Sequence, residues 1–488
     1  MTEKPAAPAR AAEISLLAAL APLLTMLVGL VLGARFMKLD APLLVSVMLA
    51  AAAVAGAIAS RRGHDFDAVQ RIMGEKLAGV LPVLLILLSI GLLIGSWVIS
   101  GTIPMLVNLG LTWVDPRFLL VTGFLVTCAM SLATGTSWGS AGTVGVALMG
   151  MAVALEVNLA ACAGAVISGA YVGDKMSPLS DSTNICAIAA DADLYKHIRH
   201  MMYTSGPSFV LCCIVYTVAG FHLGQPAAAV GVPALAGELA AAFNLSAWTL
   251  LPPLVVGLCM YVKTPPTLAM AYSSLTALLV GVAVQGFSVA QALEAAVTGF
   301  HHQMLPASAS GAAAASAAFV KLLDRGGLYS MVGNFVVILA AFLLAAGLEA
   351  SGALRRILAA LLGAAHGVFG LIAATMAAGA MMIGLTSHGG VTALVVGELF
   401  QPAYRERRLA AINLSRSLED SVTITEPLMP WTVSAVYMAS TVGVPTLQYL
   451  PWAVFCYGGP VFSLLIAALY TQTKYGIAEI VPDLEEAR

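Results

Sequence analysis

The stretch GVLPVLLILLSIGLLIGSWVI, at residues 79–99, is apolar and contains no charged residue. A helix that crosses the hydrocarbon core of a bilayer needs about 20 such residues in succession. Similar apolar runs occur at residues 14–33, 43–58, 118–133, 209–221 and 328–346. Roughly ten to thirteen candidate spans can be counted along the chain, which predicts an all-α polytopic membrane protein.

The composition supports the same class of protein. The 488 residues are 60% hydrophobic and only 10% charged, whereas about a quarter of the residues of a soluble domain are charged. A chain with so few charges cannot cover itself with a solvated surface. The net charge of −2 and the lack of a long basic stretch give no reason to expect a nucleic-acid partner.

Basic residues are distributed unevenly around the first two spans. Lys4 and Arg10 precede the first span, Arg35 and Lys38 lie between the two, and Arg61, Arg62, Arg71 and Lys76 follow the second. Because cytoplasmic loops are enriched in Lys and Arg, this pattern predicts a cytoplasmic N-terminus. The cluster at Arg405, Arg407 and Arg408 is expected on the same side.

The chain repeats itself. Ser100-Gly101 followed by Thr136-Ser137-Trp138-Gly139 is matched by Ser351-Gly352 and Thr386-Ser387-His388-Gly389, about 250 residues further on. A polar, acidic stretch then follows in each copy, at residues 173–181 and 419–427. Chance similarity in a chain rich in Gly and Ala explains the agreement in order, spacing and chemistry less well than a true repeat.

We therefore divide the chain into a first transmembrane repeat at residues 14–222, a connecting loop at 223–247 and a second repeat at 248–472. Transporters built from two such repeats bind their cargo between them, close to the bilayer midplane. The sequence does not distinguish inverted from parallel repeats, and we favour inverted ones.

The first interrupted segment is residues 134–143, TGTSWGSAGT, which follows an apolar run without a true loop. Unwound backbone at membrane depth is tolerated only where protein or a water-filled cavity surrounds it. Its hydroxyl and freed carbonyl oxygens suit a small cation such as sodium. The alternative is tight packing of small residues, which is our interpretation of the Gly91–Gly95 pair.

The second interrupted segment carries charge. Asp174, Lys175 and Asp181 lie between apolar stretches, and Pro178 interrupts the helix between the two aspartates. A charge at the bilayer centre costs roughly 2.5–3.5 kcal/mol, so it is seldom present without a function. The equivalent stretch of the second copy again has acids and a proline, which favours broken helices over a surface loop. Lys175 is either an ion-pair partner that keeps a site free of sodium or an interfacial lysine.

Paired acids at a buried site provide a mechanism of exchange. Burial and like-charge repulsion favour the protonated form of a carboxylic acid, and a bound cation favours the ionised form. Sodium and proton would then compete for one site, and alternating exposure of that site would couple the two fluxes.

Three strings of sequence carry a family resemblance. Residues 134–147, 168–184 and 413–421, together with Pro430-Trp431 and residues 443–447, resemble the signatures of the NhaC family of sodium–proton antiporters. The resemblance covers most of the chain. It implies an inverted-repeat ion-transporter fold and sodium–proton antiport in a bacterial inner membrane, with no enzymatic activity and no resident cofactor. The implied partners are sodium, protons and the lipid bilayer, and a homodimer is left open.

The matching motifs and the repeat together give a predicted cation- or substrate-binding set: Thr136, Ser137, Asp174, Ser177, Asp181, Asn184, Thr386, Ser387, His388, Asp420, Thr423 and Glu426. Within this set, Asp174, Asp181 and Asp420 are predicted to bind the transported sodium.

The chain departs from the family pattern within this expected site. His388-Gly389 replaces an Asp-Gln pair, Glu426 replaces a small residue, and Thr432 replaces an asparagine. Relatives in this family also exchange organic acids, so the sequence leaves open a sodium- or proton-coupled antiporter of an organic acid, amino acid or amine. His388 is a candidate for proton coupling because histidine titrates near neutral pH, whereas His301 and His302 are expected to be an interfacial pair.

Other classes of membrane protein fit less well. No G-x-x-x-x-G-K-[ST] loop for a nucleotide-driven pump is present. An intramembrane aspartyl protease would need G-x-G-D, but residues 171–174 read YVGD. A passive channel would not need acids in broken helices.

Overall fold

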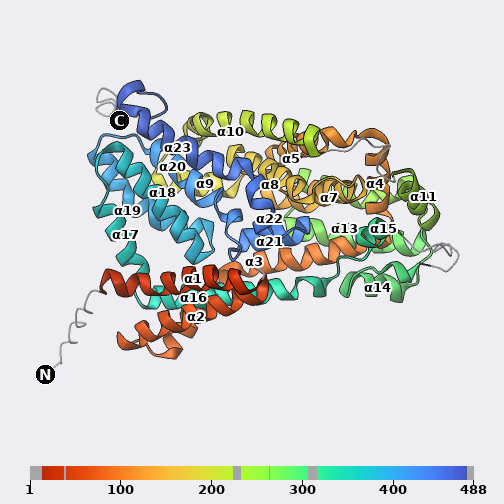
Figure 1. The fold of residues 1–488 in the computed structure, drawn as a ribbon, viewed down its shortest axis with the longest axis horizontal. Coiled ribbons are helices and arrows are strands. Elements are labelled where there is room, and N and C mark those ends of the chain that lie inside the picture. The colour runs from red at the N-terminus through yellow and green to blue at the C-terminus, as the bar shows by residue number, and fades with distance from the viewer. Residues whose placement is uncertain (1–13, 38–39, 224–231, 263, 306–315, 481–488) are drawn as a thin grey trace.

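A computed structural model of the chain describes residues 14–37, 40–223, 232–262, 264–305 and 316–480. Over these residues the chain is almost entirely helical, and two isolated β-bridges, Phe300 with Arg325 and Leu409 with Glu479, extend into no strand. Most of the long helices lie along the longest axis of the molecule (Figure 1). The predicted all-α fold is confirmed.

The first part of the chain forms helices α1 to α10. Their bounds are α1 Leu16–Phe36, α2 Ala41–Arg61, α3 Phe66–Ile99, α4 Thr102–Trp113, α5 Leu119–Thr134, α6 Ser137–Ser140, α7 Val146–Ala154, α8 Leu159–Met176, α9 Asp181–Ala190 and α10 Leu194–Leu223. A π-helical turn, η2 Ala141–Gly145, joins α6 to α7.

The remainder forms α11 to α23. Their bounds are α11 Val232–Ala242, α12 Leu251–Tyr261, α13 Pro266–Ala283, α14 Val289–Val297, α15 Ala317–Leu323, α16 Val332–Ala350, α17 Ala353–Gly363, α18 Gly367–Thr386, α19 Gly389–Glu406, α20 Ala411–Leu418, α21 Val433–Val442, α22 Thr446–Tyr449 and α23 Val454–Thr473. The segment predicted as a connecting loop contains α11, and its residues 224–231 lie outside the described part of the chain.

Nine helices among the described residues are long and apolar enough to cross a bilayer. Two bent pairs raise the number to eleven if each is one span: α3 with α4, bent by 70°, and α11 with α12, bent by 99°. Large apolar side chains such as Leu17, Ile188 and Tyr261 are exposed on the outer surface. Such a surface fits lipid better than water, so the chain is a multi-pass membrane protein.

Small residues let α3 approach its neighbours closely. The backbone amide of Gly327 donates to the carbonyl of Gly91 at 2.8 Å, and a Cβ atom at Gly95 would collide with the carbonyl of Ala295. This contact confirms the packing interpretation of the Gly91–Gly95 pair.

The local backbone geometry occurs twice along the chain. Four of the residues with positive φ in the first half have a counterpart in the second half at a nearly constant separation: Gly101 (76°) and Gly352 (70°), Gly135 (70°) and Ser387 (52°), Glu156 (50°) and Arg408 (55°), Asp191 (59°) and Gly443 (68°). Left-handed conformations of non-glycine residues are uncommon, so this agreement supports the interpretation of the two halves as copies. The domain bounds themselves remain a prediction.

The geometry also corrects the register in which the copies were aligned. Gly135 and Ser387 are the left-handed residues that end α5 and α18, so Thr136, the N-cap of α6, corresponds to His388, the N-cap of α19. The sequence comparison had aligned Thr136 with Thr386 because a Thr-Ser dipeptide occurs in both. The geometry of the helix ends defines the equivalent positions better than residue identity does.

Candidate cation site

The broken helices of the two copies line a cavity of about 430 Å³, together with residues of α3 and of the start of α13. Six residues of the predicted site line it: Thr136, Ser137, Asp174, Asp181, Thr423 and Glu426. The cavity therefore receives groups from both halves of the chain, as expected of a site between two repeats.

Asp174 is the best-defined carboxylate of the cavity. It lies in the last turn of α8, is half-buried, and accepts hydrogen bonds from the hydroxyls of Ser137 and Ser180, both at 2.6 Å. Ser137 begins α6 after the break at Gly135, and Ser180 is the N-cap of α9 after the break at Pro178. Both interruptions predicted in the first copy thus present a hydroxyl to the same carboxylate.

Thr136 organises the break between α5 and α6. Its side chain caps the new helix by accepting from the amide of Gly139 at 3.3 Å, and its carbonyl accepts from Ser140 at 2.8 Å. The helix that starts here continues through the π-turn to Ala154. Its N-terminus faces the cavity and favours negative charge there.

Glu426 is the counterpart of Asp174 in the second copy. Asp174 lies six residues before Ser180, the N-cap of α9, and Glu426 lies six residues before Thr432, the N-cap of α21. The Glu426 side chain is 9% exposed, lines the cavity, and accepts from the amide of Ser434 at 3.4 Å. A Cβ atom at Gly389 would lie 3.4 Å from its Oε2, which places the first turn of α19 beside this carboxylate.

Asp181 and Thr423 complete the predicted residues of the cavity wall. Asp181 is exposed in the first turn of α9, where its charge is favourable to the helix dipole. Thr423 ends the π-turn η7, Glu419–Thr423, which follows α20. Single π-helical turns of this kind often occur at functional sites.

The other predicted residues of the first copy stabilise the break and do not line the cavity. The Asn184 amide donates to the carbonyls of Pro178 at 3.0 Å and Ser180 at 2.7 Å. The buried Ser177 hydroxyl accepts from the amide of Leu179 at 3.3 Å. Both residues fix the connection that positions Asp174.

Thr386, Ser387 and His388 also lie outside the cavity lining. Thr386 shares a 2.6 Å hydrogen bond with Thr392, Ser387 holds the left-handed position, and Nδ1 of His388 accepts from the amide of Val391 at 3.4 Å. These residues form the end of α18 and the start of α19. Gly389 and Gly390, which follow them, line the cavity instead.

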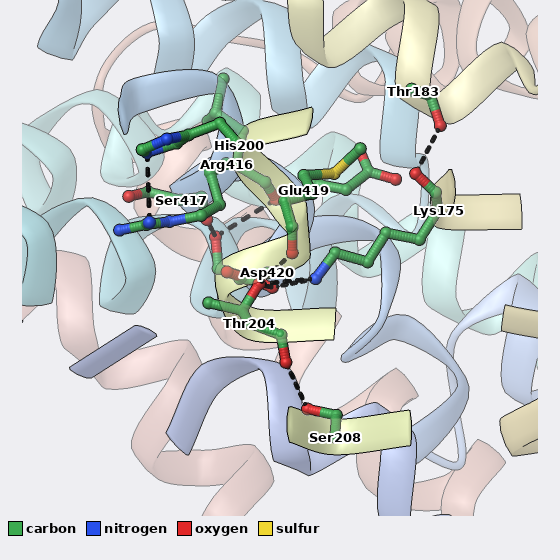
Figure 2. A network of polar contacts seen from close by, with 12 residues as sticks. Lys175, Thr183, His200, Thr204, Ser208, Arg416, Ser417, Glu419 and Asp420 are labelled. Atoms are coloured by element: carbon green, nitrogen blue, oxygen red, sulfur yellow. Dashed lines mark hydrogen bonds and ion pairs between the residues drawn. The ribbon is translucent and has the colours of Figure 1, made fainter. Parts of the chain in front are cut away.

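Asp420 has a different environment. It is fully buried in the π-turn η7 and forms an ion pair with Lys175, which is also fully buried (Figure 2). Thr204 of α10 donates to Asp420 Oδ1 at 3.3 Å and accepts from Lys175 Nζ at 3.2 Å. Of the two roles predicted for Lys175, the structure shows that of an ion-pair partner.

The three aspartates predicted to bind sodium are thus not gathered in one place. Asp174 and Asp181 line the cavity, whereas Asp420 contacts Lys175. Among the described residues, no group of three or more His, Cys, Asp or Glu is placed to hold a metal ion. A sodium ion carried through this cavity would rely on hydroxyl and backbone oxygens as well as on carboxylates.

Sequence reasoning missed several contacts. Ser182 of the cavity wall donates to the buried Glu419 of the second copy at 3.1 Å. His197 and His200, near the start of α10, are buried beside Ser415 and Arg416. Trp138 stacks on Tyr437 with ring centroids 4.4 Å apart, and the Tyr437 hydroxyl donates to the Trp138 carbonyl at 2.5 Å. No local pattern in the sequence distinguishes these residues from ordinary core residues.

Comparison with known proteins agrees with this architecture. A model of the Na+/H+ antiporter family matches residues 169–469, which include the second interrupted segment of the first copy and most of the second copy. The chain belongs to the Na+/H+ antiporter family. Members of this family are transporters, which agrees with the expectation that the chain is no enzyme.

Relatives match nearly the whole chain. An uncharacterized Na(+)/H(+) antiporter of Haemophilus influenzae is 41% identical over 95% of this chain and 97% of its own length. The Na(+)/H(+) antiporter NhaC of Alkalihalophilus pseudofirmus is 32% identical over 92% and 94%. The malate-2H(+)/Na(+)-lactate antiporter of Bacillus subtilis is 31% identical over 80% and 82%. The predicted NhaC-type resemblance is confirmed.

Proposed function

We propose that the protein exchanges sodium or lithium for protons across a bacterial inner membrane, at the cavity that Asp174 and Glu426 share. The observation that carries this proposal is the equivalence of the two carboxylates, which lie at matching positions of the two copies and line the same cavity. The family and the NhaC relative support the choice of ions.

The geometry suggests how exchange proceeds. With both carboxylates ionised, a cation is held by Asp174 and Glu426 and by oxygens such as Thr423 and Thr136. The hydroxyls of Ser137 and Ser180 stabilise the ionised form of Asp174 because they donate to both of its oxygens. A proton that binds a carboxylate removes the charge that holds sodium, so the two ions exclude one another.

We further propose that the two copies are inverted repeats and that the N-terminus is cytoplasmic. Residues 1–13, whose charges contribute to this orientation, lie outside the described part of the chain. Arg62 donates to the carbonyl of Ser351, just before α17, and Arg407 donates to the carbonyl of Ala365, just after α17. Helix α17 lies across the ends of the long helices (Figure 1), so basic residues of both copies gather at one face. That face is expected to be cytoplasmic.

A second cargo is supported by the shape of the cavity. Its 430 Å³ exceeds the space of a bare ion, and its wall includes Trp138 and Tyr171, whose rings can attract an organic ammonium group. No Lys, Arg or His is among the residues that line this described cavity. The second candidate is therefore a small amine or cationic amino acid, and the wall offers no counter-charge to an organic acid such as the malate of the relative.

Proton flux in proteoliposomes tests both candidates. Purified protein is reconstituted with a preset pH gradient, and sodium, lithium, potassium, organic amines or organic acids are added in turn. Dissipation by sodium or lithium alone supports sodium–proton exchange. A response to amines without a response to sodium would replace it with the second candidate, and a response to organic acids alone would contradict both.

A further inference from the structure

The Lys175–Asp420 ion pair lies next to the cavity but is not part of it. Lys175 follows Asp174 directly in α8, and Asp420 comes from the π-turn η7 of the other copy. Neither side chain lines the cavity, and both are completely buried. The pair needs an explanation because removing two charges from water is costly unless they stabilise each other.

The pair is closely packed on the side of Asp420 Oδ1, whereas Oδ2 is buried and has no hydrogen-bond partner among the described residues. A Cβ atom at Gly459 of α23 would lie 2.8 Å from Asp420 Oδ1 and 3.5 Å from Lys175 Nζ. Thr204 contacts both partners, and the ring of Phe455 lies 5.8 Å from the ammonium. The ammonium of Lys175 therefore occupies the place that a cation bound to Asp420 Oδ1 would take (Figure 2).

The lysine of this pair has no counterpart in the second copy. The residue that follows Asp174 is Lys175, whereas the residue that follows its counterpart Glu426 is Pro427, whose carbonyl accepts from Tyr449 at 2.6 Å. An uncompensated ammonium beside Asp174 would repel an incoming cation. The buried Arg416, one helical turn before Asp420, adds a second positive charge to this region.

We propose that Asp420 binds no cargo but cancels the charge of Lys175, so that the adjacent cavity carboxylate Asp174 can attract a cation. Asp420 is thus a positioning and screening residue that acts through Lys175. This inference rests on the proposed function only in that the cargo is a cation, and it holds equally for sodium and for an ammonium group.

Substitutions of the pair distinguish a role of Asp420 in neutralising Lys175 from a role of Asp420 as a ligand of the cargo. D420N removes the negative charge and leaves the ammonium of Lys175 uncompensated, so binding of the cation weakens. K175M removes the ammonium and cannot repel the cation. K175M/D420N removes both charges together, so cation binding should be restored. If the cargo bound Asp420 directly, adding K175M to D420N could not restore binding.

Transport kinetics in proteoliposomes test this. With the cation that the wild-type protein exchanges, we expect D420N to raise the apparent KM on the order of tenfold or more, with a smaller change in maximal rate. K175M should have an apparent KM equal to or below that of the wild type, and K175M/D420N should lie within about threefold of it. Thermal unfolding of each purified variant identifies loss of fold.

Three results would overturn the inference: a wild-type KM in D420N, a KM raised equally in K175M and D420N, or a K175M/D420N variant as impaired as D420N although it is folded. The first two would show that the pair is only structural, and the third that Asp420 itself is a ligand. A wild-type protein that exchanges no cation would overturn both the proposed function and this inference. Failure of this inference alone would leave cation exchange by the wild type intact and would appear only in the variants.

Discussion

Asp174 and Asp420 are both aspartates in interrupted helices, yet their surroundings differ. Asp174 faces a cavity of about 430 Å³ and accepts from two serine hydroxyls. Asp420 is completely buried and paired with Lys175. Asp174 is not paired with a cationic side chain, whereas Lys175 supplies the positive charge that balances Asp420.

This difference shows what makes an intramembrane acid available for transport. Burial alone does not do so, because Asp420 is the more buried of the two. An acid can exchange cations if it reaches a cavity and if no fixed cation already occupies it. By both criteria Glu426 belongs with Asp174, since it lines the cavity and forms no ion pair among the described residues.

The largest expected effect is that of Asp174→Asn. The amide keeps the size of the side chain but removes the charge that binds a cation and takes up a proton, so exchange should fall to the level of liposomes without protein. The matched control is Asp191→Asn, at an exposed aspartate that follows the same segment and pairs with Arg405 at 3.1 Å. Normal exchange by D174N would remove Asp174 from the mechanism.

Glu426→Gln tests whether the second copy contributes an equivalent carboxylate. Loss of one of two charges should weaken cation binding on the order of a hundredfold, measured as the apparent KM for sodium in proteoliposomes. The same substitution at the exposed Glu479 is the control. If E426Q keeps the wild-type KM, the cavity depends on one copy only and the comparison of Glu426 with Asp174 does not hold.

Ser137→Ala removes one of the two hydroxyls that stabilise ionised Asp174. A hydrogen bond to a charged group is worth about 1.5–3 kcal/mol, so we expect the apparent KM for sodium to rise by roughly tenfold to a hundredfold. Ser89→Ala serves as the control, because that buried hydroxyl donates to a backbone carbonyl of its own helix. An unchanged KM in S137A would mean that the contact does not tune the site.

The smallest expected effect concerns the packing of glycines beside Asp420 and Glu426. The Cβ of an alanine at position 459 would collide with Ile424 Cδ1 and lie 2.8 Å from Asp420 Oδ1, so both the Ile424 side chain and the ion pair have to shift, at a cost of about 1–3 kcal/mol in the free energy of unfolding. An alanine at position 389 would come only to 3.4 Å from Glu426 Oε2 and should be tolerated. Chemical or thermal unfolding of G459A and G389A compares them, and equal stabilities would contradict the difference between an open and a closed site.

Much of the fold could be predicted because its signals are local. Gly135 and Pro178 interrupt helices by their own backbone chemistry, and the structure ends α5 and separates α8 from α9 at these positions. The register between the copies was wrong because the Thr-Ser dipeptide at 386–387 resembled that at 136–137. Ser387 adopts the left-handed conformation that Gly135 adopts in the first copy, and sequence similarity does not reveal this.

The site was harder to predict because it depends on contacts between the copies. The sequence placed Asp174, Asp181 and Asp420 in one set because all are acids in interrupted stretches. Which acid faces the cavity depends on the direction of its side chain and on a partner that is distant in sequence, as with Lys175 and Asp420. His197 and His200 were overlooked for the same reason, since their partners lie on α20.

The most direct test of exchange at the cavity carboxylates is the release of protons by purified, detergent-solubilised protein when sodium is added in weak buffer. We expect the wild-type protein to release protons, D174N/E426Q to release none, and K175M/D420N to release as many as the wild type. Proton release by folded D174N/E426Q, or its loss in folded K175M/D420N, would contradict the assignment of exchange to the carboxylates of the cavity.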